Sequence, residues 1–205
     1  MAGAGLSHPL AILPPVLIGL DLDGVVCDLG PVVAARISER FGVASHPDTW
    51  RTYDLRLLRI GVPQAPFQSF LDDLFGDPTL YDRAPVAAGA FWGVGRLQQA
   101  GWRTVGITAR PAHLAGVTRR WLARHGIVLD EVHHTTVGGK SAVAAGLGVL
   151  VTIEDNPHEA DQLAEVCDSW LLDRPYNRDY ALAAARRLGS WEDAVGRLCQ
   201  LRLFA

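Results

Sequence analysis

The sequence predicts an α/β fold with a Rossmann-like parallel sheet sandwiched by helices and a small helical cap inserted after the first strand. Residues 16–20 form an unbroken apolar run, which is typical of a parallel strand covered on both faces. From residue 86 onward, strand-like and helix-like segments alternate, as they do in βαβ units. Between these regions, residues 43–85 are rich in aromatic residues and proline and show no strand pattern. We expect the cap in this interruption.

The individual elements follow from the spacing of apolar residues and from residues that end helices. A helix is expected over 30–42, where apolar residues recur at helical spacing and Gly42 can end the helix. Short helices are expected in the cap, for example over 64–74. The core should continue with helices over 86–100, 112–124, 140–147 and 158–166, strands over 103–108, 131–135, 149–154 and 169–173, and helical segments to the end.

This order divides the chain into three parts. Residues 1–15 are expected to be an N-terminal arm, because their short apolar stretch is broken by Pro14 and Pro15 and no basic region precedes it. Residues 16–30 and 86–205 should form the Rossmann-like core, and residues 31–85 the helical cap.

Composition narrows the possible functions. The 205 residues are 49% hydrophobic and 20% charged, which is enough for a globular core, and the formal net charge is −3. A chain with this charge has no basic surface for a nucleic acid polymer or a membrane. Its three cysteines, at 27, 167 and 199, lack the spacing of a metal site, which predicts reduced thiols and a cytoplasmic protein. A homodimer remains open.

Polar residues follow the predicted core strands. Asp21 and Asp23 come after the first strand, Thr108, Ala109 and Arg110 end the second, and Glu154, Asp155 and Asn156 end the fourth. Because the carboxyl ends of parallel strands lie at one edge of a sheet, these residues should gather there. Two neighbouring carboxylates repel each other unless a cation compensates, so the pair Asp21 and Asp23 favours a metal site. An ordinary Asp-Gly turn is the alternative for the pair alone.

Lys140 is the single lysine in a chain that otherwise uses arginine for its basic residues. It opens the helix before the fourth strand, so it should also reach the sheet edge. An ammonium is a compact point charge that suits one phosphate oxygen, whereas a guanidinium is a planar fork. Chance survival in an arginine-biased chain is the alternative.

Aromatic residues of the cap are candidates for stacking on a ligand, and Trp50 and Phe75 are the two that we single out. At helical spacing, such side chains more often form the cap's own small core. Both interpretations stay open from the sequence.

The segments GLDLDGVVCD, GITAR, Lys140 and IEDNP together resemble the haloacid dehalogenase superfamily of phosphotransferases. With DRPYN at 173–177, they are similar to its deoxyribonucleotidase (type C nucleotidase) branch. The resemblance implies Asp21 as nucleophile and Asp23 as general acid and base. It implies Mg²⁺ held by Asp21, the backbone carbonyl of Asp23 and Asp155, with Glu154 left without a defined role. Phosphate and substrate would be bound by Thr108, Ala109, Arg110 and Lys140.

These expectations converge on a Mg²⁺-dependent phosphomonoester hydrolase that acts through an aspartyl-phosphate and takes a nucleoside monophosphate. The second aspartate argues for phosphate-ester hydrolysis, because a dehalogenase needs only the first. A phosphatase for another small metabolite, such as a sugar phosphate, and a non-catalytic module that binds phospho-ligands remain as alternatives.

Overall fold

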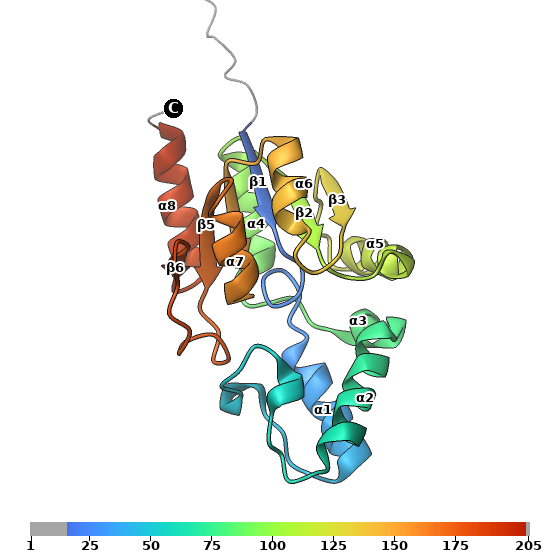
Figure 1. Cartoon of the computed structure of the whole chain (residues 1–205). Helices are drawn as coiled ribbons and strands as arrows, with labels where there is room; N and C mark the ends of the chain where they lie inside the picture. The colour runs from blue at the N-terminus through green and yellow to red at the C-terminus, as the bar shows by residue number, and fades with distance from the viewer. Residues whose placement is uncertain (1–15, 204–205) are drawn as a thin grey trace, which may run out of the picture.

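The computed structural model describes residues 16–203, with side chains up to residue 201, so the expected N-terminal arm lies outside the described part of the chain. Six parallel strands form one sheet in the order β3-β2-β1-β4-β5-β6, which places β1 between β2 and β4 (Figure 1). The strands are β1 (Val16–Leu20), β2 (Trp102–Thr108), β3 (Glu131–His134), β4 (Val151–Glu154), β5 (Asp168–Leu172) and β6 (Arg186–Leu188).

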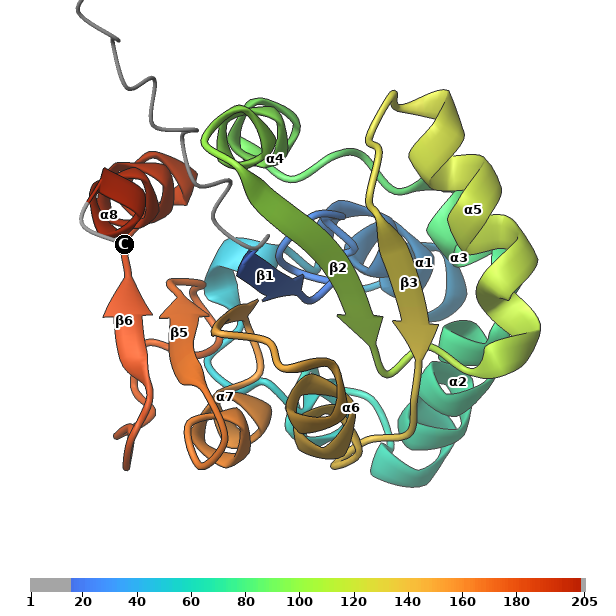
Figure 2. The same ribbon diagram turned by 90° about the horizontal axis from the view of Figure 1, so that it is seen from above.

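Helices cover both faces of the sheet. Figure 2 shows α4 (Ala90–Gln99) and α8 (Trp191–Leu203) on one face, and α6 (Lys140–Leu147) and α7 (Pro157–Leu163) on the other. The central strands are therefore buried on both sides, as their apolar sequences require. Helix α5 (Ala115–Arg124) lies beside β3. The predicted fold class is confirmed.

The segment between β1 and α4 lies at the carboxyl end of the sheet (Figure 1). It contains α1 (Gly30–Phe41), two short 3₁₀ turns, α2 (Gln64–Gly76) and α3 (Pro78–Arg83). Its two ends run side by side, because Asp28 N donates to Pro85 O over 2.9 Å and Ala87 N donates to Val26 O over 2.9 Å. This double connection supports our proposal that residues 31–85 are the cap and that 16–30 with the residues from 86 onward are the core.

Several contacts join this segment to the core. Trp121 Nε1 of α5 donates to Ala84 O over 2.7 Å, and His113 Nε2 lies 3.2 Å from Gly76 O. An ion pair joins Arg124 to Asp82. The segment is therefore attached to the core along the β2–β3 side of the molecule.

One strand was not expected from the sequence. We predicted five strands and helical segments after residue 173, whereas β6 forms at Arg186–Leu188 before α8 begins at Trp191. The strand has three residues, two of them arginine, and it lies at the sheet edge, so it shows neither an apolar run nor a clear alternation. None of the helices in the described part of the chain has the length and apolar character needed to cross a membrane.

Candidate active site

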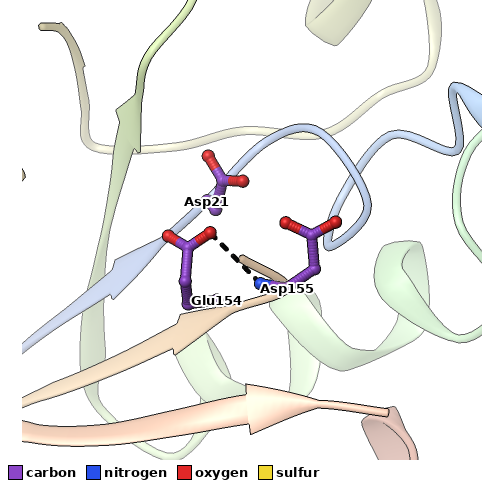
Figure 3. A group of neighbouring side chains, drawn as sticks. All are labelled: Asp21, Glu154 and Asp155. Atoms are coloured by element: carbon purple, nitrogen blue, oxygen red, sulfur yellow. Dashed lines mark hydrogen bonds between the residues drawn. The ribbon is translucent and has the colours of Figure 1, made fainter. Parts of the chain in front are cut away.

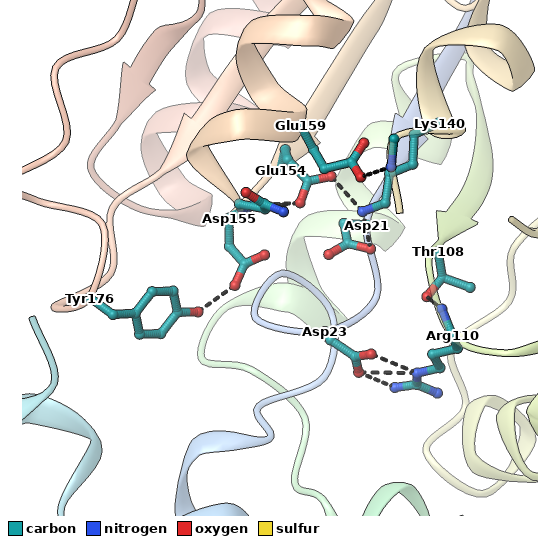
Figure 4. Close-up of polar contacts among 11 residues, drawn as sticks. Asp21, Asp23, Thr108, Arg110, Lys140, Glu154, Asp155, Glu159 and Tyr176 are labelled. Atoms are coloured by element: carbon teal, nitrogen blue, oxygen red, sulfur yellow. Dashed lines mark hydrogen bonds and ion pairs between the residues drawn. The ribbon is translucent and has the colours of Figure 1, made fainter. Parts of the chain in front are cut away.

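The predicted site residues gather where β1, β2 and β4 end and where α6 begins (Figure 4). The strand order explains this, because β1 has β2 and β4 as its neighbours and all three run in the same direction. Residues that are far apart in the sequence therefore lie around one point.

Three carboxylates form the centre of the site (Figure 3). Asp21, Glu154 and Asp155 each offer an oxygen, and these oxygens lie within 4.8 Å of one another. The three residues are 6%, 1% and 4% exposed. Buried carboxylates this close repel one another, so the cluster needs positive charge to stay ionised.

Lys140 supplies one positive charge. Its Nζ lies 2.8 Å from Asp21 Oδ1 and 2.7 Å from Glu154 Oε2, and its side chain is 3% exposed. Burial opposes the charged form, but Asp21 and Glu154 outweigh it and raise the pKa of Lys140 above its ordinary value. The ammonium therefore stays protonated between the two carboxylates.

One ammonium does not balance three carboxylates. Burial and the charge of Glu154 raise the pKa of Asp21 to about 8. Burial is also the main cause that raises the pKa of Glu154 to about 7 and that of Asp155 to about 7. Without a further cation, the site thus tends to hold protons at neutral pH.

Glu154 and Asp155 differ in how many of their carboxylate oxygens already accept hydrogen bonds or contact a cation. Glu154 Oε2 contacts Lys140, and its Oε1 accepts hydrogen bonds from Asp155 N at 3.2 Å and Asn156 N at 3.1 Å. Asp155 Oδ2 accepts a hydrogen bond from the Tyr176 hydroxyl, whereas its buried Oδ1 has no partner among the residues that the structure describes. Asp155 therefore has an oxygen available for a cation, while Glu154 holds Lys140 and the backbone in place.

Asn156 has a structural role here. Its Oδ1 accepts a hydrogen bond from His158 N over 3.0 Å, which caps the start of α7.

Asp23 lies at the outer side of the cluster and pairs with Arg110. Arg110 Nε lies 3.0 Å from both carboxylate oxygens of Asp23. The guanidinium also donates to Thr118 Oγ1 over 3.1 Å and lies over the Tyr81 ring at 4.5 Å from its centroid. The Arg110 side chain is 1% exposed, so it is a buried ion-pair partner and not a solvated surface charge.

Thr108 and Ala109 directly precede Arg110, at the end of β2. The Thr108 side chain is buried and its Oγ1 accepts a hydrogen bond from Arg110 N over 3.2 Å. This contact uses the hydroxyl as acceptor, so its proton remains available to donate to a phosphoryl oxygen. Ala109 is half-buried and offers only its backbone.

The aromatic side chains of the cap differ in how much of each is exposed to solvent. Trp50 is 3% exposed, and its Nε1 donates to Ser45 Oγ over 3.2 Å, so it belongs to the packing of the cap. Phe75 is half-buried and packs against the hydrophobic cluster of buried side chains to which Trp50 belongs. Tyr53 is instead 39% exposed, and its ring lies edge-on to Tyr176 with centroids 6.0 Å apart.

Sequence reasoning assigned no role to three residues that the structure brings to the site. Tyr176 contacts Asp155, and Tyr53 contacts Tyr176. Gly24, at φ +80°, packs closely against Asp155 and Tyr176. A Cβ added at Gly24 would fall 1.9 Å from Asp155 Oδ2 and 2.7 Å from the Tyr176 hydroxyl. Two of these had a signal in the sequence: the glycine after the DLD segment marks a turn, and Tyr176 lies in the DRPYN segment that carries part of the family resemblance.

The donor set fits a hard divalent cation. Mg²⁺ takes oxygen ligands from few carboxylates together with phosphate and water. Asp21 and Asp155 both offer carboxylate oxygens to this cluster, and Asp155 Oδ1 is a buried acceptor without a partner among the described residues. Cysteine and histidine ligands do not take part in this group.

Comparison with known proteins gives a consistent result. The model of a family described as 5' nucleotidase, deoxy (pyrimidine), cytosolic type C protein matches residues 15–204. A curated protein of Halalkalibacterium halodurans, provisionally named nucleotidase BH1399, is 26% identical over 181 residues, which cover 86% of this chain and 89% of that protein.

Solved structures share the fold. A HAD family hydrolase from Deinococcus radiodurans R1, with bound phosphate and sodium, has a TM-score of 0.60 at 22% identity and covers 91% of this chain and 96% of its own. The provisionally named HAD-hydrolase YfnB from Bacillus subtilis, bound to magnesium, has a TM-score of 0.58 at 13% identity, with 90% and 98% covered.

Proposed function

The chain belongs to the family of cytosolic type C 5' nucleotidases and is a phosphatase of the haloacid dehalogenase superfamily, and from this premise we propose that it is a Mg²⁺-dependent nucleotidase that forms an aspartyl-phosphate on Asp21. The observation that carries the proposal is the buried group of Asp21, Glu154 and Asp155 around Lys140. Such a group combines a carboxylate nucleophile, a fixed ammonium and oxygen ligands at one sheet edge.

Asp21, the backbone carbonyl of Asp23 and Asp155 are the groups that would hold the cation. When bound, Mg²⁺ would neutralise charge on the phosphoryl oxygens. The raised pKa values of Asp21 and Asp155 support a cation at this place, because a positive charge there favours their ionised forms.

The proposed reaction has two displacements. In the first, a carboxylate oxygen of Asp21 bonds to phosphorus while the bond to the ester oxygen breaks, and Asp23 gives a proton to the leaving alkoxide. In the second, Asp23 takes a proton from water as the water oxygen bonds to the phosphorus of the aspartyl-phosphate. The bond between phosphorus and the Asp21 oxygen breaks, which restores the Asp21 carboxylate and releases inorganic phosphate. Lys140 and the Thr108 hydroxyl donate to phosphoryl oxygens in both displacements.

A nucleoside monophosphate is the proposed substrate. The description of the family supports it, and so does the half-exposed Tyr53 ring, which the cap presents beside the carboxylates. An aromatic ring can stack on a base or pack against a sugar. The cytosolic family description and three free thiols, at Cys27, Cys167 and Cys199, support a cytoplasmic location.

The experiment that tests this function is phosphate release from nucleoside monophosphates, deoxynucleoside monophosphates, sugar phosphates and an aryl phosphate, with Mg²⁺ and with a chelator. We expect metal-dependent release with preference for nucleotides. Activity confined to sugar phosphates would retain the mechanism and reject the nucleotidase assignment. A folded protein that releases no phosphate but binds nucleotide would support the non-catalytic alternative.

Two variants test the roles of the residues. Asp21→Asn should lower kcat by a factor on the order of 10⁶, the loss expected when a nucleophile is removed. It should also abolish the phosphoenzyme, which acid quenching and mass spectrometry would detect. Lys140→Arg should lower kcat severely despite its charge, because the buried space between Asp21 and Glu154 accommodates an ammonium rather than a larger planar fork. Normal hydrolysis by Asp21→Asn would reject the nucleophile assignment.

A further inference from the structure

The segment that follows β5, Asp173-Arg174-Pro175-Tyr176-Asn177, lies against the site although the proposed reaction uses none of its side chains (Figure 4). Arg174 Nε donates to Gly24 O over 2.7 Å. Asn177 Nδ2 donates to Asp155 O over 2.8 Å and to Leu172 O over 3.0 Å. The segment thus fixes the backbone on both sides of the carboxylate cluster.

Tyr176 makes the contact with a side chain. Its hydroxyl donates a hydrogen bond to Asp155 Oδ2, and Figure 4 shows the ring approaching Asp155 from the side away from Asp21. The other oxygen, Asp155 Oδ1, is buried and lacks a hydrogen-bond partner within the described part of the chain. The two oxygens of Asp155 are therefore in different states, one engaged and one available.

The packing around this hydrogen bond leaves it little freedom. Gly24 lies so close that an added Cβ would fall 1.9 Å from Asp155 Oδ2 and 2.7 Å from the Tyr176 hydroxyl. On its other side, the Tyr176 ring meets Tyr53 of the cap, with centroids 6.0 Å apart. Rotation of the Asp155 carboxylate would break the hydrogen bond from Tyr176 and press on Gly24.

We propose that Tyr176 is a positioning residue that holds Asp155 Oδ2 and so presents Oδ1 alone to the divalent cation. This inference rests on the proposed function, because it assumes that Asp155 binds the cation. A carboxylate can bind a metal through one oxygen or through both, and Mg²⁺ requires near-ideal octahedral geometry with short bonds. A carboxylate already fixed by a hydrogen bond meets that requirement without being reoriented.

The test compares Mg²⁺ binding by the wild-type protein and by Tyr176→Phe, measured by calorimetry in the absence of substrate. Phenylalanine keeps the ring that contacts Tyr53 and removes only the hydroxyl. We expect about 10- to 100-fold weaker binding, the usual effect of losing a hydrogen bond to a metal ligand. Tyr180→Phe is the matched control, because Tyr180 lies three residues after this segment and its hydroxyl is 3.2 Å from His158 Nδ1 rather than near Asp155. Its Mg²⁺ affinity should equal that of the wild type.

A double-mutant cycle shows whether the effect passes through Asp155. In the Asp155→Asn background, removing the Tyr176 hydroxyl should cause no further loss of Mg²⁺ affinity, since the ligand that it positions is gone. Far-UV circular dichroism without metal checks that each variant is folded.

Infrared spectroscopy of the wild-type protein keeps the inference testable even if Tyr176→Phe does not fold. Infrared spectra are recorded with and without Mg²⁺ for the wild-type protein and for Asp155→Asn, and the difference between the two proteins gives the bands of the Asp155 carboxylate. The separation between its two stretching bands with Mg²⁺ should be that of a carboxylate bound through one oxygen. Bands typical of binding through both oxygens would overturn the inference, and so would a folded Tyr176→Phe variant that binds Mg²⁺ as tightly as the wild type. Either result would leave the proposed function intact. A wild-type protein that binds no Mg²⁺ would reject the proposed metal dependence and the inference together.

Discussion

Arg110 and Asp23 form an ion pair that joins the loop after β2 to the loop after β1, with Arg110 Nε 3.0 Å from each carboxylate oxygen. The two partners are unequally buried, because the Arg110 side chain is 1% exposed and the Asp23 side chain 28%. Tyr81 of the cap lies against the same guanidinium. The proposed general acid is therefore held by an arginine that also contacts the cap.

This unequal burial predicts unequal effects on stability. Asp23→Asn leaves a buried guanidinium without its counter-ion and should lower the free energy of unfolding by about 3 kcal/mol. Arg110→Met should cost less, because water can reach Asp23 and methionine fills part of the space. Urea unfolding measures both values. The exposed pair Arg197–Asp193 is the control, since Asp193→Asn should cost at most about 1 kcal/mol. Equal losses for Asp23→Asn and Arg110→Met would contradict this account.

Gly24→Ala should damage both the fold and the metal site. The backbone at Gly24 has φ +80°, which costs an alanine about 1–2 kcal/mol, and the new Cβ would also displace Asp155. Gly61→Ala has the same φ of +80° with no atom within 4 Å of its Cβ, so it carries the backbone cost alone. We expect Mg²⁺ affinity, measured by calorimetry, to fall in Gly24→Ala and to stay unchanged in Gly61→Ala. Equal Mg²⁺ affinity in the two variants would argue against the contact with Asp155.

Trp50 and Tyr53 should respond differently to alanine substitution. Trp50 is 3% exposed within the cap, so Trp50→Ala should lower the free energy of unfolding by about 3–5 kcal/mol. Tyr53 is 39% exposed and faces Tyr176, so Tyr53→Ala should change stability little and raise KM for a nucleotide. Chemical unfolding and steady-state kinetics separate the two effects. A higher KM for Trp50→Ala at unchanged stability would instead favour Trp50 as a ligand contact.

The carboxylate cluster predicts how stability depends on pH without metal. The pKa of Asp21 is raised from 3.8 to about 8, and those of Glu154 and Asp155 are raised to about 7. The folded protein therefore retains protons that the unfolded chain releases, so the stabilisation is full below about pH 4 and is lost as pH rises toward 8. The unfolding temperature in chelator should fall over this range.

Added Mg²⁺ should raise the unfolding temperature more at pH 8 than at pH 5.5, because the cation competes with protons for the same carboxylates. Asp21→Asn removes the group with the largest shift and should flatten the fall seen in chelator. A metal-free protein whose unfolding temperature rises steadily between these pH values would contradict the cluster's ionisation as described.

The sequence predicted the α/β fold class and five of the six strands because their signals are local. An apolar run ending in Asp21 identifies both the central strand and the edge at which its side chains lie. The expected strands over 103–108 and 131–135 agree with β2 and β3 to within one residue at each end. In contrast, β6 has too few residues to produce a pattern.

The contacts within the site were harder to predict, because they depend on how loops pack. No local signal shows that Glu154 would hold Lys140, or that Arg110 would be buried against Asp23, since each pair forms only when separate strands meet. Tyr176 and Tyr53 lie in segments without regular structure, more than a hundred residues apart, and meet only in the folded molecule. The contact of Tyr176 with Asp155 could be recognised only from the three-dimensional arrangement.

The central position of β1 also shapes how the protein is made. Val16 pairs with Trp102 and Ile18 pairs with Val151, so β1 can meet β2 only after the cap segment and α4 have been synthesised, and β4 only after α5, β3 and α6 as well. Both edges of this apolar strand are therefore open to wrong pairing and aggregation until β2 is made, and the edge facing β4 stays open for longer. The nascent chain should therefore depend on shielding by chaperones, and its proposed nucleophile, Asp21, should lack Lys140 and Glu154 until α6 and β4 have been synthesised.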